Sequence, residues 1–406
     1  MKALLLENIH PLAAELLGGK GVEVTTEPGS LDEDELIDAL EGVSLLGIRS
    51  KTTITERVLA SRPDLLAVGA FCIGTNQIDL DAAVRRGVAA FNAPFSNTRS
   101  VVELALAEII ALTRRLTEKD KALHQGIWDK SANGAHEVRG RTLGIVGYGN
   151  IGTQLSVLAE ALGMRVVFYD TAEKLALGNA RRMPSLNALL EVADVVTLHV
   201  DGRAGNAGMF GADQFRRMKP GALFLNLSRG FLVDYAYLSD AISSGALAGA
   251  AVDVFPDEPK RNGAPFDSEL RGLPNVILTP HVGGSTEEAQ QDIAVFVAGK
   301  LRDYLQAGST ALSVNMPTLT LEAPRSGRQR VTHLHRNVPG VLAEVNQALS
   351  SGGANIDSQM LATVGGVGYA VTDISGALPD AARERLRQIE ATIRVRELLS
   401  PEDAGQ

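Results

Sequence analysis

Three residues that could share acid–base chemistry lie far apart in the chain: Arg229, Glu258 and His281. Each follows an apolar run typical of a strand, and the carboxyl ends of parallel strands meet at one edge of a sheet. An arginine can hold a carboxylate through two hydrogen bonds, and a histidine can accept a proton near neutral pH. A carboxylate can orient the imidazole and raise its pKa. Singly, each residue would be read as a loop salt bridge or a cap, but together they suit oxidation of a 2-hydroxy acid.

A dinucleotide site is predicted by residues 139–170, which read as a strand, a glycine turn, a helix and a second strand. Gly147 would make the turn, Gly149 would let a pyrophosphate approach the backbone, and Gly152 would let the helix pack closely. The helix N-terminus offers N–H groups and a positive dipole end to the phosphates. Asp170 can accept hydrogen bonds from the adenosine ribose and repel a 2′-phosphate. The pattern favours an NAD site over an NADP site and over a merely structural turn.

Composition and charge narrow the class of protein. The chain has 406 residues, so we expect two or three domains. A formal net charge of −9 without basic runs argues against a nucleic-acid surface. The single cysteine, Cys72, cannot form an internal disulfide and lies in an apolar run that favours packing. Neither a signal peptide, a membrane span nor metal-ligand spacing is recognisable, so we expect a cytoplasmic protein without a metal.

The first part of the chain alternates short apolar strands with helices. Strands are expected at residues 2–6, 22–26, 44–48 and 65–70, with helices at 11–17 and 31–40. Such alternation predicts an open parallel sheet, whose ligands bind beyond the carboxyl ends of the strands. Arg49-Ser50-Lys51 and Gly74-Thr75-Asn76 lie at such ends. Two cations flanking a hydroxyl suggest an anion site, although a solvated loop explains the same residues equally well.

A long apolar helix is expected before the glycine turn. It should begin near Ser100, which has capping-box spacing to Glu103, and run to about Leu116. Because it is apolar on most faces, we expect it to be buried between domains. Trp128 follows in a polar segment, where it could anchor into another subunit or cover the local core.

After Asp170 the alternation continues to a last strand at 276–279, and a helix at 287–307 could return to the first part. His199 also falls at a strand end, but we expect it to be structural. The predicted domains are a discontinuous substrate-binding domain (1–97 and 286–316) and a Rossmann-like NAD-binding domain (98–285) inserted in it. Residues 317–329 are expected to form a linker. Residues 330–406 read as βαββαβ, which predicts a ferredoxin-like module.

Several motifs resemble those of one enzyme family. GYGNIG at 147–152, NLSRG around Arg229, VDVFPDEP around Glu258 and LTPHVGGST around His281 are similar to motifs of the D-isomer-specific 2-hydroxyacid dehydrogenases, within them the D-3-phosphoglycerate dehydrogenase family. GTNQIDLDAA and FNAPFSNTRSV match as well, and the C-terminal module resembles an ACT regulatory domain. The resemblance covers nearly the whole chain. It implies a flavodoxin-like substrate domain. It also implies the NAD-dependent oxidation of 3-phospho-D-glycerate to 3-phosphohydroxypyruvate. This reaction is the first step of L-serine biosynthesis from glycolysis, and feedback inhibition by L-serine is implied as well.

The resemblance also implies roles for individual residues. Arg229 would bind the substrate, Glu258 would support catalysis, and His281 would be the general acid and base. The residues expected at the cofactor are Gly147, Gly149, Asn150, Ile151, Gly152, Asp170, Leu227, Ser228, Asp253, Gly283 and Gly284, with Asp253 at the nicotinamide amide. Those expected at the substrate are Arg49, Ser50, Lys51 and Asn97, with Lys130 in the loop that reaches across subunits together with Trp128. L-Serine is expected at His335, Asn337 and Asn355, in a homotetramer with serine sites between paired regulatory domains.

Two positions depart from the family pattern. Lys51 stands where close relatives have arginine. A lysine cannot form the bidentate hydrogen bonds with a phosphate that an arginine forms. Asp201 stands where the family usually has the proline of LHVP, and Gly202, Gly205 and Gly208 follow it. We expect this loop to be looser, and NAD binding weaker, than in relatives with the proline.

Two other functions stay open. One is a dehydrogenase of another 2-hydroxy or 2-keto acid, such as glyoxylate or lactate. The other is a dinucleotide-sensing scaffold without catalysis, like the corepressors that share this fold. The Arg49-Ser50-Lys51 cluster and the ACT module favour the phosphorylated substrate, and the intact set of Arg229, Glu258 and His281 argues against a scaffold. Some family members also reduce 2-oxoglutarate to 2-hydroxyglutarate, which the resemblance allows here as a side activity.

Overall fold

The computed structural model describes residues 1–19, 21–259 and 263–400. The chain forms two compact units, one from Met1–Pro94 together with the segment from Gln290 onward, and the other from Phe95–Ala289. The last residues of the predicted regulatory module, 401–406, lie outside the described residues. The predicted division into a discontinuous substrate-binding domain, an NAD-binding domain, a linker and a regulatory module remains a proposal.

The first unit contains a five-stranded parallel sheet with the order β2-β1-β3-β4-β5. This is the flavodoxin-like strand order. The apolar strands are buried because helices cover both faces, with α1 and α11 on one side and α2, α3 and α4 on the other. The strands are β1 (Lys2–Leu5), β2 (Glu23–Thr26), β3 (Val43–Ile48), β4 (Ala67–Ala70) and β5 (Ala89–Phe91). The helices are α1 (Leu12–Leu17), α2 (Glu33–Ala39), α3 (Glu56–Ser61), α4 (Leu80–Arg85) and α11 (Glu287–Ala307).

The second unit is built on a seven-stranded parallel sheet with the order β12-β11-β10-β9-β6-β7-β8. The chain runs outward from β6 to β8 and then returns to place β9 beside β6, so the strand order reverses next to the glycine turn. The strands are β6 (Thr142–Val146), β7 (Arg165–Tyr169), β8 (Arg181–Arg182), β9 (Val195–Leu198), β10 (Ala222–Asn226), β11 (Leu247–Val252) and β12 (Val276–Leu278).

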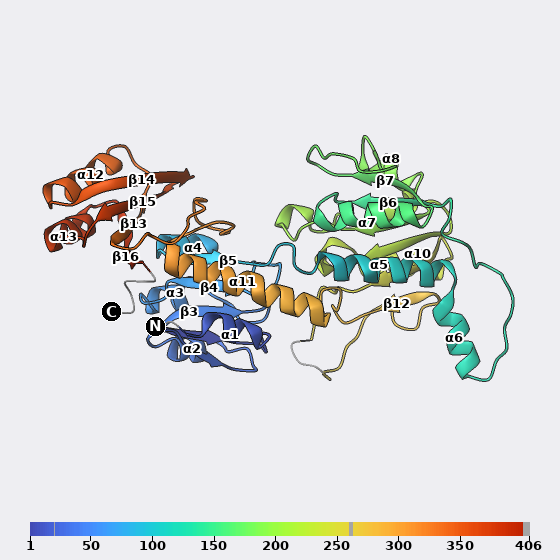
Figure 1. Ribbon diagram of the computed structural model, residues 1–406. Helices are drawn as coiled ribbons and strands as arrows, with labels where there is room; N and C mark the ends of the chain where they lie inside the picture. The colour runs from blue at the N-terminus through green and yellow to red at the C-terminus, as the bar shows by residue number, and fades with distance from the viewer. Residues whose placement is uncertain (20, 260–262, 401–406) are drawn as a thin grey trace. The chain divides into compact units, whose positions relative to one another are not determined.

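Helices cover both faces of this second sheet as well (Figure 1). The helices α5 (Thr98–Thr113) and α7 (Asn150–Ala161) pack on one face. The opposite face carries α8 (Leu186–Leu190), α9 (Ala212–Arg217) and α10 (Tyr235–Ser243). The helix α6 (Leu116–His124) follows α5, and short 3₁₀ turns lie at Ala204–Asn206 and Gly230–Leu232. The predicted fold class, a Rossmann-like domain inserted in the sequence of a flavodoxin-like domain and followed by a C-terminal ferredoxin-like module, is confirmed.

The C-terminal module of the first unit has the predicted βαββαβ order and one antiparallel sheet, β14-β15-β13-β16. Its two helices pack against one face of the sheet. On the other face, the Tyr369 hydroxyl donates to Gly308 O at 2.8 Å, and the Arg394 guanidinium donates to Leu65 O at 2.8 Å. The elements are β13 (Arg328–Arg336), α12 (Val341–Ser351), β14 (Asn355–Val364), β15 (Val367–Ser375), α13 (Asp380–Gln388) and β16 (Thr392–Leu399).

The predicted start of the long helix is wrong. α5 begins at Thr98, so Ser100 lies inside the first turn and its hydroxyl pairs with that of Thr286 at 2.8 Å. Glu103 pairs with Arg99 instead of closing a capping box. Within the described residues, no helix combines the length and apolar character needed to cross a membrane, and no group of three potential metal ligands is found.

Candidate active site

The glycine turn after β6 leaves a space in front of the N-terminus of α7. Gly147 has φ +93°, and a Cβ there would lie 2.5 Å from the carbonyl oxygen of His199, so only glycine fits. A Cβ at Gly149 would meet nothing within 4 Å, so this backbone is open to a ligand. No side chain caps the helix, and its first N–H groups, beginning with those of Asn150 and Ile151, suit a pyrophosphate.

Asp170 follows β7 and faces the same turn. One carboxylate oxygen accepts the Tyr148 N–H at 2.8 Å, and the other accepts the Ala172 N–H at 2.8 Å. Each oxygen has a second lone pair, so the carboxylate can also accept ribose hydroxyl groups. The predicted NAD residues of this βαβ unit are therefore brought together, and they fit a dinucleotide.

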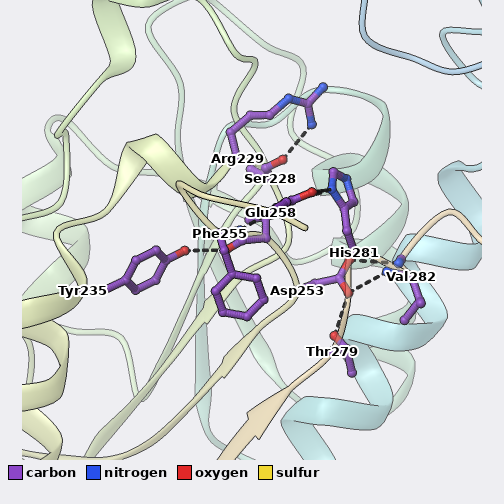
Figure 2. Close-up of polar contacts among 11 residues, drawn as sticks. Ser228, Arg229, Tyr235, Asp253, Phe255, Glu258, Thr279, His281 and Val282 are labelled. Carbon is purple, nitrogen blue, oxygen red and sulfur yellow. Dashed lines mark hydrogen bonds and ion pairs between the residues drawn. The ribbon is translucent and has the colours of Figure 1, made fainter. Parts of the chain in front are cut away.

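His281 and Glu258 form a hydrogen-bonded pair (Figure 2). His281 Nδ1 lies 2.8 Å from Glu258 Oε2 and 3.1 Å from Oε1, and the Phe255 N–H donates to Oε1 at 3.1 Å. The hydrogen bond with Glu258 raises the pKa of His281 above 6.5, although partial burial opposes it. Partial burial alone would raise the pKa of Glu258, but its hydrogen bonds with His281 and Phe255 hold that pKa below 4.5.

Asp253 fixes the loop that carries His281. Its carboxylate accepts the Thr279 hydroxyl at 2.6 Å and the N–H groups of Val282 and Gly283 at 2.8 Å each. His281 itself has φ +55°, a left-handed conformation that a non-glycine residue keeps only when its surroundings hold it. The buried carboxylate thus has three of about four lone-pair sites occupied by the loop, which leaves one for the predicted nicotinamide amide.

Arg229 lies close enough to the pair for its charge to lower the pKa values of both Glu258 and His281. Its Nη1 donates to Ser228 O at 2.6 Å (Figure 2). The Ser228 hydroxyl in turn donates to Leu198 O at 2.6 Å. A Cβ on the next residue, Gly230, would clash with the backbone of Phe255, so the segments after β10 and β11 pack tightly. Arg229, Glu258 and His281 are therefore assembled at one edge of the sheet.

The remaining predicted residues of this unit are placed as follows. Leu227 is buried at the end of β10. A Cβ on Gly284 would clash with the amide of Asn97, so Asn97 lies beside the loop that carries His281. Lys130 is exposed in the segment after α6, next to Trp128, which is 80% exposed. His199 is half-buried, its Nε2 lies 3.0 Å from the Thr197 hydroxyl, and burial of the ring lowers its pKa to about 4.

Six predicted residues belong to the first unit. Arg49, Ser50 and Lys51 follow β3. In the C-terminal module, His335 is buried on β13 with Nδ1 2.9 Å from Arg336 O, and it pairs in register with Gly368. Asn337 is exposed just beyond β13, and Asn355 is exposed at the start of β14.

Three residues at the site were missed by sequence reasoning. The buried Tyr235 hydroxyl donates to Val254 O at 2.6 Å, which fixes the segment leading to Glu258. Thr279 contributes to the clamp on Asp253. On α5, burial and then the charge of Asp253 raise the pKa of Glu108 to about 8, so both favour the neutral form of this 3% exposed acid. Their contacts join distant segments, which apolar periodicity does not report.

Comparison with known proteins agrees with this geometry. The family model "D-isomer specific 2-hydroxyacid dehydrogenase, NAD binding domain" matches residues 106–283, and the model "AHAS small subunit-like ACT domain" matches residues 331–397. The curated D-3-phosphoglycerate dehydrogenase of Escherichia coli (strain K12) is 47% identical over 399 residues, which are 98% of this chain and 97% of that protein. The enzyme of the same name from Dictyostelium discoideum is 44% identical over 398 residues, 98% of this chain and 97% of that protein.

Solved structures of related enzymes share the fold. The D-lactate dehydrogenase of Aquifex aeolicus, solved with NAD and lactic acid, matches with a TM-score of 0.69 and 25% identity, over 78% of this chain and all of that chain. A D-2-hydroxyisocaproate dehydrogenase matches with a TM-score of 0.70 and 25% identity, over the same shares. The high identity over almost the whole length is decisive: the chain belongs to the D-3-phosphoglycerate dehydrogenases, within the D-isomer-specific 2-hydroxyacid dehydrogenase family.

Proposed function

We propose that the protein oxidises 3-phospho-D-glycerate to 3-phosphohydroxypyruvate with NAD, the first step of L-serine biosynthesis, and that L-serine inhibits it. The observation that carries the proposal is the His281–Glu258 pair beside Arg229, on the sheet that also carries the glycine turn and Asp170. A dinucleotide-sensing scaffold without catalysis fits these findings less well. The chain belongs to an enzyme family, and its acid–base pair is assembled.

The chain's own residues divide the chemistry among them. Arg229 would bind the substrate carboxylate through its guanidinium group and polarise the C2 oxygen. With Nδ1–H donated to Glu258, Nε2 of His281 is the nitrogen that takes the C2 hydroxyl proton in oxidation and returns it in reduction. Glu258 stabilises the imidazolium that forms. Bound NAD supplies the hydride acceptor, held by the N-terminus of α7 and by Asp170.

The substrate's phosphate would be recognised by Arg49, Ser50 and Lys51, with Asn97 and Lys130 completing the substrate site. Lys51 offers a point charge in place of a planar fork, so we expect it to contribute charge rather than a bidentate hydrogen bond. With these residues at the phosphate, the enzyme should prefer a phosphorylated acid to an unphosphorylated one such as glyoxylate or lactate.

The regulatory assignment requires two copies of the module. His335 pairs in register with Gly368 and Asn355 pairs with Ser375, so the two lie at opposite ends of β15. That stretch of strand spans roughly 23 Å, far more than the length of a serine molecule. We therefore propose that His335 and Asn337 of one subunit bind L-serine together with Asn355 of the partner subunit, as paired modules would allow.

We further propose that the protein is a homo-oligomer, with a tetramer as the predicted state. Exposed apolar side chains cluster on and after α6, with Leu123 57%, Ile127 55% and Trp128 80% exposed. Such a patch is typical of an interface. Light scattering on a Trp128→Ala variant tests this, since an unchanged mass would argue against the anchor. A cytoplasmic location stays a prediction.

NADH oxidation with 3-phosphohydroxypyruvate, titrated with L-serine and compared with 2-oxoglutarate and glyoxylate, tests the main proposal. We expect high activity on the phosphorylated substrate that falls as serine rises. Activity without a serine response would refute the effector site but would support the proposed enzymatic activity. Activity on the unphosphorylated acids alone would refute the phosphate site at Arg49, Ser50 and Lys51. Turnover of 2-oxoglutarate would establish the side activity.

A further inference from the structure

Glu7 is a buried acid at the end of β1 that faces a neighbouring strand end. It is 8% exposed. One carboxylate oxygen accepts the Lys51 N–H at 3.0 Å, and the other accepts the Thr52 N–H at 2.8 Å. Because β1 and β3 are adjacent in the sheet, this side chain crosses from the end of one strand to the loop after the other.

The backbone at Glu7 is arranged to make that crossing. Glu7 and the following Asn8 have φ +62° and +53°, which are left-handed conformations in two consecutive non-glycine residues. Such conformations are costly and persist where the surrounding structure holds them. The Glu7 N–H donates to Gly29 O at 3.0 Å. A solvated acid would not need this geometry, so the turn serves to direct the carboxylate.

The loop 49–52 is fixed from its other side by Gln77. The Gln77 amide donates to Arg49 O at 2.6 Å, and Gln77 O accepts the Ile54 N–H at 2.8 Å. Thr52 is fully buried, whereas Ser50 and Lys51 are exposed. The main chain of the loop is thus held by Glu7 and Gln77, while the side chains of Ser50 and Lys51 remain exposed.

A carboxylate beside an anion site is electrostatically unfavourable, since like charges repel. Its presence beside Arg49-Ser50-Lys51 therefore requires a compensating role. A carboxylate can accept two N–H groups at once, whereas an amide has one acceptor oxygen and an NH₂ group that would face the second N–H. The geometry of the loop thus requires an acid, not merely a polar side chain.

We propose that Glu7 is a positioning residue for recognition of the substrate's phosphate: by binding the N–H groups of Lys51 and Thr52, it sets the direction in which Arg49, Ser50 and Lys51 present their side chains. This inference rests on the proposed function, because it takes those three residues as the phosphate site. Glu7 itself does not contact the reacting atoms.

The test is steady-state kinetics of Glu7→Gln and Glu7→Asp in the full-length protein. Both variants should raise the KM for 3-phosphohydroxypyruvate about tenfold, with kcat and the KM for glyoxylate changed less than twofold. Inorganic phosphate, used as a competitive inhibitor, should lose affinity in parallel. Glu7→Asp keeps the charge but shortens the reach, so normal behaviour in this variant would overturn a geometric role. Circular dichroism and thermal melting establish that each variant is folded.

Asp32→Asn is the matched control, since Asp32 also accepts a backbone N–H in the same unit but caps α2. Asparagine caps a helix about as well as aspartate, so this variant should leave both the stability and the KM for the phosphorylated substrate nearly unchanged. Equal changes for both substrates in Glu7→Gln, or a lower KM, would overturn the inference. If Arg49→Ala removes the preference for the phosphorylated substrate while Glu7→Gln does not, the inference fails and the proposed function stands. An unchanged preference in Arg49→Ala would overturn both.

Discussion

Replacing Glu258 by glutamine should shift the pH dependence of catalysis. The hydrogen bond with Glu258 is the largest cause of the raised pKa of His281, and partial burial opposes it. In Glu258→Gln the pKa of His281 should therefore fall. Oxidation needs neutral His281, so its kcat/KM rises as pH increases through that pKa. Reduction needs protonated His281, so its kcat/KM falls as pH rises through the same value. Both transitions should move to lower pH in the variant.

The size of the rate effect follows from exposure. The side chains of His281 and Glu258 are 48% and 37% exposed, so solvent screens their interaction. A hydrogen bond to a charged group contributes about 1.5–3 kcal/mol when shielded, which we reduce to about 1 kcal/mol here. That corresponds to a roughly fivefold lower kcat/KM at the optimum. Removing His281 itself should cost far more, about 10²–10⁴-fold.

The assay is a pair of pH–rate profiles, one for each direction, for the wild type and Glu258→Gln. Asp267→Asn, which breaks an exposed ion pair with Arg271, serves as the control and should leave both profiles unchanged. The raised pKa of His281 also contributes stability that is present below pH 6.5 and lost as pH rises through the folded value. The melting difference between wild type and variant should therefore shrink at alkaline pH. Profiles with unshifted midpoints would refute the role of Glu258.

Three further predictions concern the cofactor and the effector. Asp170→Ala removes the carboxylate that accepts the ribose hydroxyl groups and the Tyr148 N–H. The KM for NAD should therefore rise about 10–100-fold, and the preference for NAD over NADP should shrink. Steady-state kinetics with both cofactors measures the two effects. Asp201→Pro should tighten NADH binding two- to fivefold by stiffening the loop, roughly 0.4–1 kcal/mol, and an equal Kd by fluorescence titration would count against this. Asn337→Ala should abolish serine inhibition and keep kcat, whereas loss of both would show that the domain division is wrong.

The sequence predicted the fold well where the signals are local. Strands of the C-terminal module, the long helix α11 and the glycine turn all fall within a few residues of their expected places, because apolar periodicity and turn residues define them. The two-residue strand β8, made of exposed Arg181 and Arg182, has no apolar signal and was missed. The capping box at Ser100 failed because that spacing also occurs inside a helix, where Ser100 instead pairs with Thr286.

The site was predictable as a set of chemical groups but not as an arrangement. Strand ends pointed to Arg229, Glu258 and His281, and the structure assembles them. The left-handed backbone of His281 and the clamp that Asp253 forms on its loop could not be read from the sequence. Such contacts join a side chain to backbone groups of a distant segment, and neither spacing nor composition specifies them.

The strand-end loops of both units share one device. In four of the loops that follow parallel strands, a carboxylate accepts backbone N–H groups of the loop or of a neighbouring turn. The four acids are Glu7, Asp170, Asp253 and Glu258. A carboxylate suits this task because it accepts several hydrogen bonds, and charge makes each one stronger. The same charges oppose anionic ligands, so cationic side chains must outweigh them where a phosphate or carboxylate binds. Replacing such an acid by its amide removes the second acceptor but also weakens the repulsion of an anionic ligand. Weaker binding of that ligand in the amide variant would therefore show that the geometry of the loop outweighs the charge of the acid.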